Sequence, residues 1–393
     1  MLADFLARSA YQMGKTPLLP IFAASLGASG AFLGLIVSVS TITGLVLKPL
    51  IGILSDRWGR RVWLLVGAGF FAFMPFLYRF IQSPEQLLLI RLVHGLATAI
   101  YGPVTLAYVA ELSRRDRGRA AETEPSIAED IGWFQMARSG GYILGPALAG
   151  WLLLSLDAAA VFTIIGIISC AVFLPILRLP EARPAKRRKF KPILQHIRQA
   201  IGDGGRTPAV WLTGGLEAVT FIALYTLKVF LPLYALEAGV SVALVGLYFS
   251  FNEAAHVLGK PFCGRLSDRW GYLPAITLGM LILAAALPLV RLLDQGLLFL
   301  APAVLMGLAQ ALIFPAAIAL VSDRISAENL GAGMGLIGML QNFGKVAGPV
   351  FGGMAIMTLG YDATLVGLSA LLLIGALTIW SLFTPRKRIK ASH

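Results

Sequence analysis

The chain has 393 residues, of which 57% are hydrophobic and only 13% charged, and 33 Lys and Arg outnumber 20 Asp and Glu. A single aqueous core does not grow large enough to bury so much apolar surface. Soluble enzymes and nucleic-acid-binding proteins are therefore disfavoured, and we expect the chain to lie in a lipid bilayer.

Twelve apolar stretches are each long enough to cross the bilayer as a helix, which takes about 20 residues. The first six lie near 2–24, 31–52, 62–81, 86–112, 131–154 and 159–179. The other six lie near 209–235, 242–263, 274–293, 297–321, 332–357 and 363–383. We expect an all-α membrane protein with six-helix bundles at 1–179 and 209–383, a cytoplasmic linker at 180–208 and a tail at 384–393.

The distribution of basic residues predicts the orientation in the membrane. The 23 Lys and Arg outside the predicted spans lie at span ends and loops of one side or in the C-terminal tail. The loops of the other side hold acidic residues and no basic ones. Because basic loops stay on the cytoplasmic side, both termini are predicted to be cytoplasmic. Topology thus accounts for most of the net charge of +13.

The linker contains the basic string AKRRKFK at 185–191, and apolar residues then follow at helical spacing, at positions 190, 193, 194, 197 and 201. This pattern is typical of a basic amphipathic helix lying on the inner leaflet. We favour a tether between the two halves over a docking site for a partner.

A twelve-residue string occurs twice, as KPLIGILSDRWG at 48–59 and as KPFCGRLSDRWG at 260–271. Nine of the twelve positions match, at a spacing of 212 residues, and a Gly-Pro pair at 145–146 recurs at 348–349. This internal duplication predicts two bundles related by a pseudo-twofold axis along the membrane normal, with a substrate site between them near the midplane. We expect each string to form a short loop between two helices.

Three motifs resemble signatures of the major facilitator superfamily. GILSDRWGRR at 52–61 resembles its loop between the second and third helices, and RLVHGLATA at 91–99 its fourth-helix signature. GWFQMARSGGYILGPALAG at 132–150 resembles the fifth-helix signature of the drug–proton antiporter branch, although its last residue departs from the usual glycine pair. The resemblance implies alternating access and a cavity lined chiefly by helices one, four, seven and ten.

The resemblance also implies a gate at the cytoplasmic mouth. Asp56 and Asp268 are expected to face the starts of helices in the opposite bundle, where an acid is stabilised. Basic residues of the motif are expected to reach Glu111, and such pairs would hold the halves together inside and favour the outward-facing state. The alternative is a turn that supplies only topogenic charge. The charged gating candidates are Asp56, Arg57, Arg60, Arg61, Glu111, Asp268 and Arg269.

The Gly-Pro pairs at Gly145-Pro146 and Gly348-Pro349 are further gating candidates. Gly141 and Gly344 each precede the pair by four residues and share its helix face, which we expect to let helices of opposite halves approach closely. The prolines remove a backbone hydrogen bond and permit a bend.

Charged residues inside spans usually face a cavity or a partner, because they are costly in hydrocarbon. Glu253 and His256 belong to one polar stripe, and Glu253 lies about 17 Å from the outer helix end, at 1.5 Å per residue. A carboxylate near mid-membrane is suited to carrying a proton. The alternative is a static ion pair, for which Lys345 is the expected partner.

Other polar faces supply further candidates. Glu217 is a second candidate proton carrier, and Arg91 matches a position that the superfamily links to proton coupling. A histidine such as His94 can titrate near neutral pH, although it is as often a packing residue. The candidate substrate contacts are Arg8, Gln12, Lys15, Tyr101, Arg138, Phe221, Tyr225, Lys228 and Lys345.

Ten basic residues but about three deep acids lie within the predicted spans. Such an interior favours anionic or zwitterionic substrates, in contrast to the cationic drugs that many antiporters expel. The prediction is therefore a secondary active transporter that exports a small organic, anionic compound by proton antiport. Uptake by symport shares every motif except that of the fifth helix.

Two further classes are poorer alternatives. A non-transporting receptor would need a large output domain, whereas the longest polar segment is the linker. An intramembrane enzyme would need a catalytic set, and no HExxH or paired-acid motif lies at membrane depth. We expect no metal, no cofactor and no nucleic acid; the partners are lipid, protons and a small-molecule substrate, and the chain is expected to be a monomer in a prokaryotic inner membrane.

Overall fold

The computed structural model describes residues 1–117, 127–180, 207–292, 296–325 and 330–383, with Gly202 and Gly205, and these ranges contain no β-strand. The all-α prediction is confirmed for them. The N-terminal helices are α1 (Leu2–Lys15), α2 (Leu18–Ser25), α3 (Gly30–Trp58), α4 (Arg60–Leu77), α5 (Pro84–Arg117), α6 (Ile127–Leu152), α7 (Ala158–Cys170) and α8 (Phe173–Leu177). The C-terminal helices are α10 (Pro208–Glu237), α11 (Val242–Trp270), α12 (Tyr272–Leu292), α13 (Leu300–Arg324) and α14 (Leu330–Phe383).

Nine helices within the described ranges are long and apolar enough to cross a membrane. Three local features account for the difference between these nine helices and the twelve predicted spans. The first span is divided into α1 and α2 around Pro17, and α6 carries charged residues in its first half. The last two spans form the single helix α14, which has non-helical backbone at Gly360 (φ 83°).

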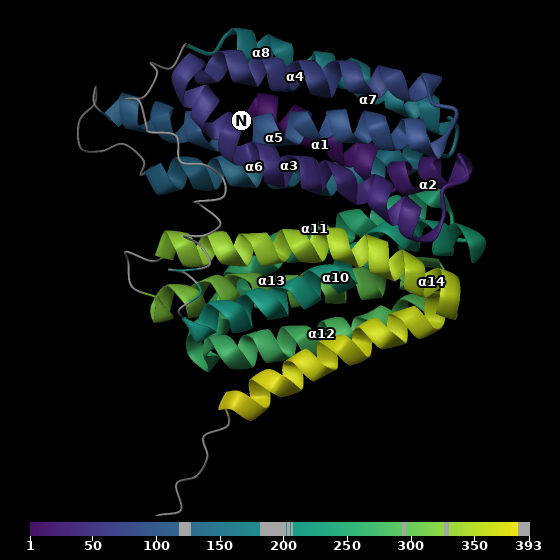
Figure 1. The fold of residues 1–393 in the computed structure, drawn as a ribbon, viewed down its shortest axis with the longest axis vertical. Coiled ribbons are helices and arrows are strands. Elements are labelled where there is room, and N and C mark those ends of the chain that lie inside the picture. The colour runs from purple at the N-terminus through teal and green to yellow at the C-terminus, as the bar shows by residue number, and fades with distance from the viewer. Residues whose placement is uncertain are drawn as a thin grey trace, which may run out of the picture.

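The helices run side by side in two groups (Figure 1). Those of the N-terminal part, α1–α8, lie together, and α10–α14 lie together beside them. Within the first group α1 packs on α6 and α3 on α5; within the second, α10 packs on α14 and α11 on α13. These are equivalent pairs under the duplication. Between the groups, α3 packs on α14 and α6 on α11.

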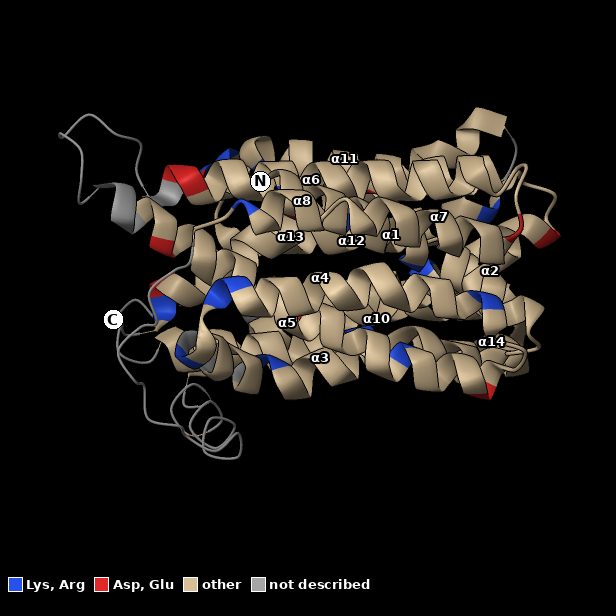
Figure 2. Cartoon of the chain, turned by 90° about the horizontal axis from the view of Figure 1, so that it is seen from above, with Lys and Arg blue, Asp and Glu red and all other residues tan. Residues whose placement is uncertain are grey.

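The surface of the helices suits a lipid environment. In Figure 2 the helices are uncharged along most of their length, and much of the charge lies toward their ends, although several basic residues lie farther in. Large apolar side chains are exposed on the flanks, including Phe73, Ile167 and Ile374. Such exposed apolar surface is stable in a bilayer rather than in water.

The repeated string is helical, so the prediction of a short loop was wrong. α3 continues to Trp58 and α11 to Trp270. The turn is one residue, Gly59 (φ 92°) or Gly271 (φ 95°), in a conformation that glycine adopts without steric cost. Polar residues at a helix end can extend the helix beyond the apolar layer, because the helix satisfies its own backbone hydrogen bonds.

The linker with its expected amphipathic helix, apart from its ends and two glycines, and the tail at 384–393 lie outside the described residues.

Candidate functional site

The two groups of helices meet closely at the end opposite the basic motifs. A methyl group placed on Gly34 of α3 would lie 2.0 Å from the carbonyl oxygen of Pro349 in α14. A methyl group placed on Gly246 of α11 would likewise lie 2.4 Å from the carbonyl oxygen of Pro146 in α6. Ser250 adds a hydrogen bond across the second contact, accepting from the Ala147 backbone N–H at 3.0 Å. The two contacts are equivalent under the duplication.

The predicted role of the paired glycines is only partly right. Gly141 and Gly145 do allow close packing, but against α1 of the same half, at Ser9 and Gln12. Gly344 and Gly348 likewise pack on α10 of their own half, and not on the opposite half as expected. The helix face was predictable from the four-residue spacing, but the helix that meets this face depends on the packing. Pro146 and Pro349 each follow one of these glycines. Their backbone carbonyl groups contact the opposite half, at Gly246 and Gly34.

A central cavity lies between the two groups, in two adjoining compartments. The wide compartment has a volume of about 460 Å³ and takes lining from α1, α3, α5, α6, α10 and α14. The deep compartment, of about 250 Å³, is lined mainly by α10, α11 and α13. They adjoin because Gln12, Tyr142, Tyr225 and Lys228 line both. This is the size range of small-molecule sites.

The wide compartment is strongly basic. Among the described residues its charged lining is entirely positive: Arg8, Lys15, Lys48, Arg138, Lys228 and Lys345. Lys15 of α1 and Lys228 of α10 lie over the same ring, with Nζ 5.5 and 5.8 Å from the Tyr225 centroid. Lys345 of α14 lies 4.3 Å from the Phe221 centroid. Aromatic rings, rather than carboxylates, are therefore the close partners of these three ammonium groups.

The two arginines of the wide compartment are already paired. Asp4, which is 2% exposed, accepts hydrogen bonds from Arg138 Nε at 2.8 Å and Nη2 at 3.1 Å. Arg8 Nε lies 3.7 Å from the same carboxylate. Thr105 accepts a further bond from Arg138 Nη2 at 3.0 Å, which links α1, α5 and α6. One carboxylate balances only one of the two guanidinium charges, so this group keeps one net positive charge, and the lysines, which have no such partner among the described residues, add theirs.

The deep compartment combines aromatic and ionisable groups. Phe221 and Phe314 stack with centroids 4.9 Å apart, and His256 meets the Phe314 ring edge-on at 5.8 Å. Glu253 Oε1 lies 3.7 Å from His256 Nδ1. Among the described residues the close ionisable neighbour of Glu253 is therefore His256 on the same helix, and the alternative of a static pair with Lys345 is not found.

Four other candidates do not line this cavity. Glu217 is 1% exposed and accepts a hydrogen bond from Gln341 Nε2 at 2.6 Å, while its second carboxylate oxygen has no hydrogen-bond partner. Arg91 donates to Ser40 Oγ at 2.8 Å. His94 Nδ1 lies 3.1 Å from the Tyr78 hydroxyl, as expected for a packing residue. Tyr101 packs edge-on against Phe71 and is not a cavity wall.

The gating candidates form no ion pair between the halves in the described part of the chain. Arg60 Nη1 pairs with Glu111 Oε2 at 2.8 Å, as expected, but both residues belong to the N-terminal group. Arg61 donates instead to the Leu177 carbonyl oxygen at 2.6 Å. The Asp56 side chain lies outside the described residues, and Arg57, Asp268 and Arg269 are exposed. The Arg60–Glu111 and Arg61–Leu177 contacts therefore lie within the N-terminal group, and the predicted gate, which would form only when this end is closed, stays a prediction.

Several cavity residues were not predicted. Tyr142, Gln310, Phe314 and Asn342 line one or both compartments. The two amides had a usable signal, since polar side chains within membrane helices usually face a cavity or a partner helix. Gln310 Nε2 donates to Asn252 Oδ1 at 3.3 Å. The aromatic residues Tyr142 and Phe314 carried no such sequence signal, because aromatic rings are equally common on lipid-facing surfaces.

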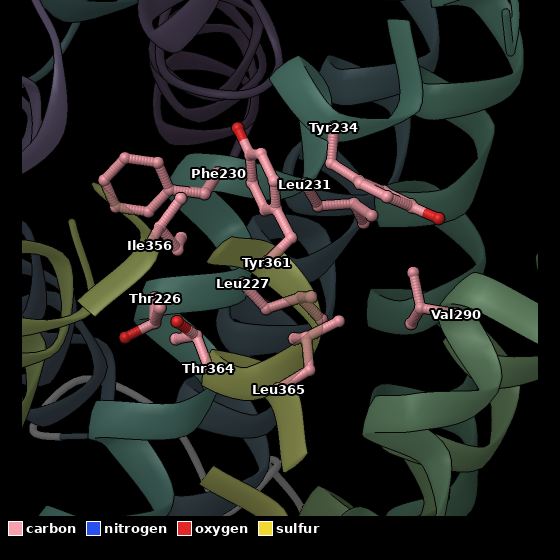
Figure 3. Close-up of a pocket in the computed structure, with 10 residues that line it drawn as sticks. All are labelled: Thr226, Leu227, Phe230, Leu231, Tyr234, Val290, Ile356, Tyr361, Thr364 and Leu365. Atoms are coloured by element: carbon pink, nitrogen blue, oxygen red, sulfur yellow. The ribbon is translucent and has the colours of Figure 1, made fainter. Parts of the chain in front are cut away.

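A second recess, between α10, α12 and α14, is shown in Figure 3. Its lining residues are Thr226, Leu227, Phe230, Leu231, Tyr234, Val290, Ile356, Tyr361, Thr364 and Leu365. The volume is about 10 Å³, which is room for one water molecule at most. No lining side chain is charged. This recess is too small and too apolar to be the substrate site.

The fold and the central cavity define an integral, multi-pass membrane protein of the transporter class. The family model of the Major Facilitator Superfamily matches residues 3–254 and again 213–393. The chain belongs to this superfamily, whose members are transporters, so the prediction that it is not an enzyme is confirmed.

Similar proteins agree with this assignment. The chain is 24% identical to the multidrug resistance protein MdtG of Citrobacter koseri over 100% of its own length and 95% of that protein. It is 25% identical to a multi-drug resistance efflux pump PmrA homolog of Lactococcus lactis over 95% and 91%. The crystal structure of the nucleoside transporter NupG has the same fold, with a TM-score of 0.83 at 14% identity over 98% of both chains. Resemblance to the drug-efflux branch is therefore confirmed.

Proposed function

We propose that the chain is a secondary active transporter that exports a small organic anion in exchange for protons. The observation that carries this proposal is the cavity between the two helix groups, in which Lys15, Lys228 and Lys345 have no acidic ion-pair partner among the described residues. Uncompensated positive charge in a low-dielectric cavity attracts anions and repels cations. Export is supported by the names of the efflux relatives.

The proposed architecture is twelve crossings in two six-helix bundles, 1–179 and 209–383, joined by the linker 180–208. In this arrangement both termini and the basic motifs face the cytoplasm of a prokaryotic cell. The halves touch at the end opposite the motifs, through Gly34 with Pro349 and Gly246 with Pro146. We therefore propose that the described conformation is the inward-facing state of an alternating-access cycle, in a monomer.

Glu253 and His256 are the proposed proton-coupling pair. Both line the deep compartment, and among the described residues each forms the other's salt bridge when the imidazole is protonated. Antiport requires that the proton and the anion bind in turn, so an ionisable pair that lines the cavity is placed to carry the proton when the substrate is absent. Glu217 is the second candidate, because one of its buried carboxylate oxygens lacks a hydrogen bond.

Flux in proteoliposomes tests the proposal. Purified protein is reconstituted, a pH gradient is imposed, and uptake of radiolabelled organic anions and cations is measured in both gradient directions. Accumulation of an anion on the acidic side, abolished by a protonophore, is expected for antiport. Accumulation on the alkaline side would establish symport instead, and flux of cations alone would refute the anion assignment.

A further inference from the structure

Three lysines from two halves of the molecule converge on one aromatic cluster. Lys15 and Lys228 lie over Tyr225, and Lys345 lies over Phe221, whose ring is 5.9 Å from that of Tyr225. Because Lys15 and Lys228 share one ring, their Nζ atoms are at most about 11 Å apart. Lys15 belongs to α1 and the other two to α10 and α14.

The aromatic faces are weak substitutes for a negative partner. A charge-assisted hydrogen bond from an ammonium group to a carboxylate is stronger than a cation–π contact of the same group. No acidic side chain of the described residues lines this compartment, Asp4 is occupied by Arg8 and Arg138, and Glu253, which lines the deep compartment together with Lys228, makes its close contact with His256. A carboxylate entering the cavity is therefore the missing partner of these lysines.

The adjoining compartment defines the rest of the ligand. Phe314 and Tyr225 present aromatic surface beside the lysines, Phe221 is covered by Phe314 and Lys345, and the Asn252–Gln310 amide pair lies on the same lining. A flat ring stacks favourably on such surfaces, whereas a saturated ring gains only apolar contact. The geometry points to a planar aromatic carboxylate, whose carboxylate binds between Lys15 and Lys228 and whose ring enters the deep compartment. This inference rests on the proposed function and specifies its substrate class.

Binding to the purified full-length protein in detergent tests the inference without requiring transport. The probes for isothermal titration calorimetry are 2-naphthoate, its saturated analogue decalin-2-carboxylate, and 2-naphthylmethylammonium, which has the same ring system with the opposite charge. We expect 2-naphthoate to bind at least 10-fold more tightly than either analogue. We also expect its affinity to fall with rising salt concentration, because screening weakens the attraction.

Variants locate the site. Lys15→Gln and Lys228→Gln are each expected to weaken 2-naphthoate binding at least 10-fold, while Lys228→Arg keeps the charge and stays within about threefold of the parent protein. The matched control is Arg265→Gln, which removes an exposed positive charge outside both compartments. Unchanged affinity in both glutamine variants, or tighter binding of the ammonium compound, would overturn the inference. The comparison of the three probes on the parent protein remains informative if a variant does not fold.

Failure of this inference is distinguishable from failure of the proposed function. Proton-coupled flux of another anion, with no binding of 2-naphthoate, would overturn the substrate class and leave antiport intact. Binding of 2-naphthoate that depends on both lysines, with no flux of any tested compound under a pH gradient, would support the site and refute the transport proposal.

Discussion

Gly34 of α3 lies directly against the carbonyl group of Pro349 in α14, and no side chain fits between them. The equivalent contact, Gly246 with Pro146, joins the other pair of helices across the two halves. Backbone atoms approach this closely only where a side chain is absent. The end of the cavity opposite the basic motifs is therefore closed by two glycines related by the duplication.

Gly34→Ala is expected to open this end. The added methyl group would lie 2.0 Å from a backbone oxygen, and overpacking of this kind costs about 1–3 kcal/mol. A change of 1.4 kcal/mol shifts a two-state equilibrium tenfold, so the ratio of open to closed molecules should increase by about 5-fold to 150-fold. Double electron–electron resonance between spin labels at that end measures it. Gly69→Ala, where a methyl group meets nothing within 4 Å, is the control and should leave the distances unchanged.

Glu253→Gln is expected to abolish transport driven by a pH gradient while substrate exchange at equal pH continues. The amide cannot release a proton, but it retains the size of the carboxyl group next to His256. Flux with and without a gradient separates the two effects. Glu237→Gln, on an exposed residue at the end of α10, should behave as the parent protein. Gradient-driven flux that persists in Glu253→Gln would transfer the coupling role to Glu217 or elsewhere.

Asp4→Asn is expected to destabilise the protein substantially. The change leaves the Arg8 and Arg138 guanidinium groups without their shared counter-charge, and breaking a buried ion pair costs about 3–5 kcal/mol. Thermal unfolding in detergent measures the loss. The double variant Asp4→Asn/Arg138→Gln should recover part of it, because one orphaned charge is also removed. A double variant less stable than the single variant would contradict this account.

Arg60→Gln and Glu111→Gln are expected to have small effects on stability, about 1 kcal/mol or less, because both side chains are partly exposed. The pair lies within one half, so neither variant should change the balance between inward-facing and outward-facing states. The same spin-label distances test this. A shift toward the inward-facing state in both variants would show that the Arg60–Glu111 pair does take part in gating.

The helical segments were predictable because they depend on length and apolarity along the chain. Glu253 and His256 were found as one stripe because residues three apart share a helix face. The alternative that paired Glu253 with Lys345 was not found, and of the motif arginines Arg60 pairs with Glu111 while Arg61 donates to the Leu177 carbonyl oxygen. The partner of each acid depends on the distances between helices. The sequence does not give these distances, and it offers several basic side chains of similar length for each acid.

The sequence by itself determined that the chain lies in a membrane, that its two halves are duplicates, and that positive charge exceeds negative charge within the apolar segments. Each of these follows from composition or from repetition along the chain. Only the tertiary structure decided which glycines touch the opposite half, that Asp4 pairs with both Arg8 and Arg138, and that Lys15 and Lys228 share the ring of Tyr225. Helical periodicity determines the face on which a residue lies, but the neighbour that meets that face is selected by close packing of helices far apart in the chain.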